Sequence, residues 1–153
     1  MTRPFRPAIA AALVAVMLSG CAPAKEEEPA MDLAAVQREL DGIGGVVESS
    51  TGARNTGVPG GYALRVQLVV DDDGLASIGE VLQEAVDDVA GAASAAEGYR
   101  EYEFTVSVTD PSSPTGTRRV TLSRHQERIA IDQGALTSSL ILTADELAAA
   151  AAR

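Results

Sequence analysis

Tryptophan is absent from this sequence, and cysteine and histidine occur once each, as Cys21 and His125. A zinc site needs several histidine or cysteine ligands, and a serine triad needs a histidine base held by an acid. No serine lies in a G-x-S-x-G sequence, and we expect His125 at the exposed edge of a hairpin. The sequence therefore predicts a protein that is not an enzyme and that holds no metal or cofactor.

Basic residues and aromatic side chains are also scarce. The chain has 12 basic and 22 acidic residues, and its formal net charge is −10. Because a surface that binds nucleic acid needs a basic footprint, this balance argues against a nucleic-acid partner. Much of the apolar content is alanine, which buries little area per residue, and one cysteine allows no intrachain disulfide. We therefore expect a domain of modest stability that depends on its core.

The first twenty residues have the pattern of a secretory signal peptide. Arg3 and Arg6 give a positive start, residues 8–18 form an apolar run, and Ser19 and Gly20 are small. The apolar run is too short for a membrane-spanning helix, which needs about 20 apolar residues. The sequence therefore predicts export and removal of residues 1–20.

The single cysteine follows this signal directly. Leu18-Ser19-Gly20-Cys21 resembles the lipobox of bacterial lipoproteins. The resemblance covers these four residues and the preceding signal, so it indicates a processing class and not a fold. It implies cleavage between Gly20 and Cys21, a thioether from the Cys21 sulfur to diacylglycerol, and an anchor at the extracytoplasmic face of the cell membrane. The alternative is a soluble secreted protein with a chance cysteine.

The residues after Cys21 are typical of a spacer. Residues 21–30 include three consecutive glutamates and two prolines, which keep a segment hydrated and extended. All 22 acidic residues but only 10 of the basic residues follow residue 20, so the processed chain has a formal charge of −12. We expect an acidic tether at 21–30 and a single domain at 31–153, held off anionic lipid.

Residues 31–153 alternate between helical and strand periodicity. Helices are predicted at 33–43, 78–96 and 144–153, and strands are predicted at 46–51, 62–70, 101–109, 120–122 and 140–142. Ser77 with Glu80, and Thr143 with Glu146, fit the capping box that opens a helix. Long loops are predicted at 51–61 and 110–116, and the strand register must break between Arg124 and Arg128.

This order of elements predicts an α+β fold. Alternation leaves a sheet with one apolar face, which helices can cover. We expect a two-layer sandwich with a mostly antiparallel sheet of four to five strands and helices on one face. A ferredoxin-like topology, or a permuted relative of it, is the first specific arrangement to consider, although such folds host many functions.

Two charged clusters invite a functional interpretation. Asp71-Asp72-Asp73-Gly74 resembles part of an EF-hand loop, and Glu80 stands where the last ligand would be. Val69 occupies the position of the first acidic ligand, so we expect instead a strand exit with negative charge before a helix N-terminus. The arginines 118, 119, 124 and 128 can receive an anionic ligand, but pairing with acidic neighbours is the expectation for so acidic a chain.

Together these features favour a non-enzymatic, lipid-anchored module that binds an unknown protein partner outside the membrane. The 52–61 and 110–117 loops are the predicted binding surface, because loops carry function more often than sheet faces do. The alternative is a carrier of a small apolar or lipidic ligand, which needs a cavity between sheet and helices that small alanines can leave. An enzyme is the remaining interpretation.

Overall fold

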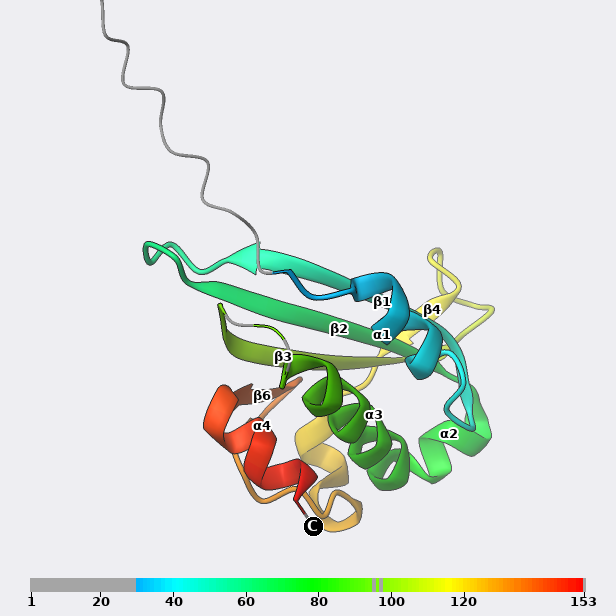
Figure 1. Cartoon of the computed structure of the whole chain (residues 1–153). Helices are drawn as coiled ribbons and strands as arrows, with labels where there is room; N and C mark the ends of the chain where they lie inside the picture. Colours follow the sequence, from blue (N-terminus) through cyan, green and yellow to red (C-terminus); the bar gives the residue numbers. More distant parts are fainter. Residues whose placement is uncertain (1–29, 95, 97, 153) are drawn as a thin grey trace, which may run out of the picture.

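Figure 1 shows the computed structural model of the chain, which describes residues 30–94, 96 and 98–152. The predicted signal peptide (1–20), Cys21 and most of the predicted tether (21–30) lie outside the described residues. The helices are α1 (Leu33–Leu40), α2 (Asp72–Ala76), α3 (Ile78–Ala93), the 3-10 helix η1 (Leu122–Arg128) and α4 (Ala144–Ala151). The strands are β1 (Val46–Asn55), β2 (Tyr62–Val70), β3 (Tyr99–Thr109), β4 (Thr117–Arg119), β5 (Ala135–Leu136) and β6 (Leu140–Thr143).

The strands form one open sheet in the order β1-β2-β3-β6-β5. β4 pairs with the last residues of β3, beyond the stretch of β3 that pairs with β6. β2 and β3 run parallel, and the other strand pairs among the described residues are antiparallel. The predicted α+β class with a mostly antiparallel sheet is therefore confirmed. The sheet has six strands instead of four or five, because the two-residue β5 extends its edge.

The topology differs from the ferredoxin-like arrangement considered above. A ferredoxin-like sheet is built from split β-α-β units, in which another strand separates the two parallel strands. Here β2 and β3 are direct neighbours with Val66 opposite Phe104. Parallel neighbours need a long crossover, and the 16 residues of α3 provide it.

The core lies between the sheet and the helices that cover one of its faces (Figure 1). Alternate residues of β2 and β3 point into it and are buried: Leu64, Val66, Leu68, Val70, Tyr102, Phe104, Val106 and Val108. The apolar face predicted for 78–96 lies against them: Ile78, Leu82, Ala85, Val86 and Val89. The opposite sheet face is polar, with Gln67 exposed and Arg65 paired to Glu103 at 3.1 Å.

Side-chain hydrogen bonds attach α1 to the edge strand β1. Asp41 Oδ1 accepts hydrogen bonds from the Ser49 amide at 2.8 Å and the Ser49 hydroxyl at 2.7 Å. Gln37 Nε2 donates to the Ser49 carbonyl at 3.0 Å. Ser49 is only 3% exposed, so its amide, carbonyl and hydroxyl groups need these partners. The bonds satisfy part of an open sheet edge and place α1 beside α3.

Two segments predicted as loop or strand have a different structure. β1 continues to Asn55, because residues 51–55 pair with residues 62–66, and the loop therefore shortens to 56–61. The return strand after the 110–116 loop ends at Arg119, and η1 follows it. The 3-10 turns of η1 are the register break predicted between Arg124 and Arg128, and they begin earlier than expected.

One of the two predicted capping boxes is present. Thr143 Oγ1 accepts from the Glu146 amide at 3.3 Å, and Glu146 Oε2 accepts from the Thr143 amide at 2.8 Å. The box predicted for Ser77 is absent, because the preceding helix α2 ends there and the Ser77 hydroxyl donates to the Asp73 carbonyl at 2.9 Å. The short helix α2 was not predicted, and Asp71 caps it instead of preceding the helix that starts at Ile78.

The contact of α3 with η1 predicts opposite effects for alanine at two glycines of α3. A Cβ on Gly79 would overlap the Arg128 carbonyl, whereas a Cβ on Gly91 would meet no atom within 4 Å. Gly79→Ala should lower the free energy of unfolding by about 1–3 kcal/mol through overpacking. Gly91→Ala should raise it by up to about 1 kcal/mol through helix propensity. Urea unfolding followed by circular dichroism measures both, and equal effects would contradict the close packing of η1 on α3.

Candidate functional site

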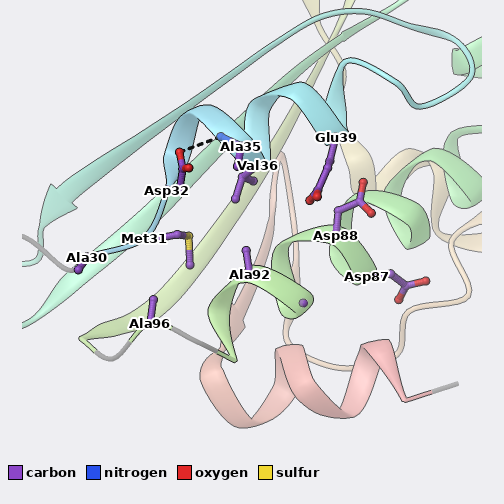
Figure 2. Close-up of a pocket in the computed structure, with 11 residues that line it drawn as sticks. Ala30, Met31, Asp32, Ala35, Val36, Glu39, Asp87, Asp88, Ala92 and Ala96 are labelled. Carbon is purple, nitrogen blue, oxygen red and sulfur yellow. Dashed lines mark hydrogen bonds between the residues drawn. The ribbon is translucent and has the colours of Figure 1, made fainter.

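A groove between α1 and α3 is the largest of the described cavities, with a volume of about 620 Å³ (Figure 2). We call it the α1–α3 groove. Residues at helical spacing on the two helices face each other across it, together with the segment that leads into α1. Its lining consists of Ala30, Met31, Asp32, Ala35, Val36, Glu39, Asp87, Asp88, Gly91, Ala92 and Ala96.

The floor of the groove is apolar. Met31 and Val36 lie deepest, with exposed fractions of 9% and 1%. The walls carry the small residues Ala35, Gly91 and Ala92, and around Gly91 there is open space where a Cβ would stand. Small side chains on two neighbouring helices therefore leave a groove that a larger apolar side chain can fill.

The rim of the groove is acidic. Its charged lining residues are Asp32, Glu39, Asp87 and Asp88, which come from both helices. Burial raises the pKa of Asp88, and the negative charges of Glu39, Glu84 and Asp87 raise this pKa further. The four charged groups have the same sign, so a cationic group in the groove would relieve their repulsion.

Asp32 also has a structural role at this rim. Its Oδ1 accepts a hydrogen bond from the Ala35 amide at 3.0 Å, which caps α1 (Figure 2). Within the described part of the chain, Glu39, Asp87 and Asp88 cap no helix, although Asp87 Oδ1 accepts a hydrogen bond from Gln83 Nε2 at 3.0 Å. They are therefore the better positions at which to change the charge of the groove.

A second, smaller pocket lies between α3, α4 and the start of β3. We call this cavity of about 330 Å³ the α3–α4 pocket. Its lining is mostly apolar and rich in alanine: Ala90, Ala93, Ser94, Ala96, Gly98, Tyr99, Tyr102, Ala144, Leu147 and Ala148. Burial raises the pKa of Tyr102, whose ring lies 6.1 Å from that of Tyr99. This pocket lies between sheet and helices, where the carrier interpretation requires one.

The two loops predicted to form one binding surface lie at opposite ends of the sheet. β2 and β3 run parallel, with Tyr62 opposite Tyr99 and Val70 opposite Val108. The 56–61 loop precedes β2, whereas the 110–116 loop follows β3. The prediction of a joint loop surface is therefore wrong, because it assumed no particular strand direction.

Neither of the two charged clusters singled out in the sequence, the aspartates 71–73 and the arginines 118, 119, 124 and 128, lines the α1–α3 groove. Asp71 caps α2, and its Oδ1 accepts from the Gly74 amide at 2.8 Å. Among residues 30–94, 96 and 98–152, no three histidine, cysteine, aspartate or glutamate side chains are grouped to hold a metal ion. Arg118 pairs with Asp110 at 3.5 Å. Pairing fails for the other three arginines of the cluster, which form no ion pair within the described residues: Arg119, Arg124 and Arg128.

His125 lies in η1 and is half-buried, so its predicted place at the exposed edge of a hairpin is wrong. The hairpin strand ends at Arg119, before the histidine is reached. Within the described residues, no hydrogen bond joins His125 to a serine or a carboxylate.

Sequence reasoning missed the groove, although it predicted both helices that form it. The apolar spacing showed which face of each helix is buried, but nothing in it showed that the two helices are neighbours. A signal was present in the small residues Ala35, Gly91 and Ala92. Each of them lies four residues, or about one helical turn, from an acidic residue on a partly exposed helix face.

No protein-family model, no curated protein and no solved structure matches this chain. In the part of the chain that the structure describes, every helix is too short or too polar to cross a membrane. The interpretation of the groove therefore depends on its geometry and charge.

The raised pKa of Asp88 predicts how the groove affects stability. In the unfolded chain the pKa of Asp88 is the ordinary aspartate value of 3.8, and in the folded state it is higher. The folded state therefore holds the proton more tightly, so ionised Asp88 lowers stability at neutral pH. Asp88→Asn should therefore raise the free energy of unfolding at pH 7 by a few tenths to about 1 kcal/mol. The difference should shrink as the pH falls through the folded pKa towards 3.8, as urea unfolding at several pH values would measure.

A matched variant separates this effect from a general change in charge. Glu127→Gln removes one negative charge from η1 instead of the groove, and it should have a smaller effect on stability at pH 7. Repulsion between partly exposed charges is screened by salt, so 1 M NaCl should reduce the gain from Asp88→Asn. A gain that is independent of pH and salt would contradict the electrostatic origin.

Proposed function

We propose that the chain is a membrane-anchored extracytoplasmic lipoprotein, a non-enzymatic interaction module that binds a protein partner in the α1–α3 groove. The observation that carries this proposal is the position of the groove. Its lining begins at Ala30, where the predicted tether enters the domain. An apolar floor within a polar rim is the usual anatomy of a site that binds another protein.

The tether limits how far the groove can stand from the membrane. Nine residues lead from Cys21 to Ala30, and an extended chain covers at most about 3.3–3.6 Å per residue, or about 30 Å in all. An anchor on Cys21 would therefore keep the groove close to the bilayer surface. A partner confined to the same surface would meet it at a raised effective concentration.

A carrier of a small apolar or lipidic ligand is the second candidate function. The α3–α4 pocket supports it, since alanines, two tyrosines and a leucine line a cavity of about 330 Å³. This volume is near the lower end of the range of about 300–1,000 Å³ that is typical of ligand pockets. The wider α1–α3 groove and its charge favour a protein partner over a small apolar ligand.

The anchor predicts a clear result for Cys21→Ser. A hydroxyl cannot form the thioether to diacylglycerol, so the variant should lose incorporation of radioactive palmitate and leave the membrane fraction. Labelled cells that express either form would be fractionated and compared. Equal label and equal sedimentation of the two forms would contradict the anchor and, with it, the proposed localisation.

The binding module predicts site-specific contacts in the cell. A small diazirine amino acid at Ala35, inside the groove, should give one discrete protein adduct on irradiation of cells that naturally make the chain. The same group at Gln67, exposed on the opposite face of the sheet, should give none. Electrophoresis of the irradiated cells measures both. Absence of an adduct at Ala35, or equal adducts at both positions, would contradict a partner in the groove.

A further inference from the structure

We propose that the occupant of the α1–α3 groove is a cationic amphipathic helix of the partner protein. Its large apolar side chains would fill the floor, and its lysines or arginines would lie along the acidic rim. This inference rests on the proposed function and names the chemistry of the partner.

The negative charge of the groove favours an occupant with positive charge. Every charged lining residue is acidic, and burial, followed by the negative charges of Glu39, Glu84 and Asp87, raises the pKa of Asp88. An acidic or neutral occupant would leave these carboxylates unpaired and less hydrated, whereas lysine or arginine would pair with them. The chain's own residues 22–29 contain three consecutive glutamates, so repulsion argues against this neighbouring segment as the occupant.

The shape of the groove favours a helix. Asp32, which caps α1, and the α1 residues Ala35, Val36 and Glu39 line the groove. From Asp32 to Glu39 there are seven residue steps, which span about 10 Å at 1.5 Å per residue. An amphipathic helix laid into such a groove offers apolar side chains at positions i, i+3, i+4 and i+7 along a similar length. The small side chains of Ala35 and Ala92 in the walls of the groove allow the backbone of the bound helix to approach closely.

A second copy of this chain fits the groove less well. Within the described residues, three of the arginines that form no ion pair, Arg119, Arg124 and Arg128, lie on or beside η1, and the latter two are exposed there. Leu122, the buried apolar residue of η1, is 0% exposed and packs into the core of its own molecule. A second copy that docked through η1 would therefore bring positive charge to the groove without a large apolar side chain to fill its floor.

The test uses a synthetic 14-residue helix of leucine and lysine, with the leucines on one face, as the probe. Its affinity for the full processed chain carrying Cys21→Ser, which needs no detergent, is measured by fluorescence anisotropy at 150 mM NaCl. Asp87→Asn combined with Asp88→Asn should weaken binding at least tenfold. Asp72→Asn combined with Asp73→Asn removes the same charge from α2 and should weaken binding less than twofold.

A second pair of variants tests the apolar floor without changing charge. Ala35→Trp should fill the groove and weaken binding at least tenfold, whereas Ala34→Trp, at the exposed neighbouring position on α1, should change affinity less than twofold. Circular dichroism of each variant confirms that it is folded. A leucine–glutamate helix of the same length should not bind.

Four results would overturn the inference. Equal losses in the two double variants would show that binding follows total charge, and unchanged binding to Ala35→Trp would place the probe elsewhere. Self-association that Ala35→Trp abolishes would show that a second copy is the occupant. Failure of the probe with a persistent adduct from Ala35 in cells would reject the cationic helix and leave the proposed function standing. Loss of that adduct as well would reject both.

Discussion

Burial of the apolar face of α3 against β2 and β3 is the interaction on which the rest of the structure depends. Ile78, Leu82 and Val89 are fully buried, and the helix returns the chain so that β3 lies parallel to β2. Parallel strands in direct contact require such a crossover, and its helix packs on one face of the sheet. The parallel direction of β3 and the separation of the 56–61 and 110–116 loops follow from this crossover.

The candidate site is a consequence of the same packing. Once the apolar face of α3 is buried, Asp88 lies towards α1 and Asp87 borders the same groove (Figure 2). Asp41 and Gln37 hold α1 against the edge strand. Two helices that are each attached firmly to the sheet, and that meet through small residues, leave a groove between them. On an isolated helix in water, the repulsion between these acidic residues would be weak. At the shared rim of the groove, partial burial strengthens it.

Much of the fold was predictable because its signals are local. The alternation in 62–70 and the helical spacing in 78–96 each depend on a few neighbouring residues, and both elements form as expected. Predictions failed where a competing contact decided the outcome. Ser77 has the sequence of a cap but bonds to α2, and the turn-forming residues 51–55 extend β1 because β2 provides a partner strand.

By itself the sequence determined the class of each major element, its buried face, the acidity of the chain and the pattern that predicts an anchor at Cys21. Only the tertiary structure decided that β2 and β3 are parallel neighbours, that the 56–61 and 110–116 loops are separated, and that α1 and α3 form an acidic groove. The physical reason is the separation along the chain of the residues that interact. Periodicity and capping act within a few residues, whereas strand pairing and helix neighbours depend on contacts between segments that are distant along the chain.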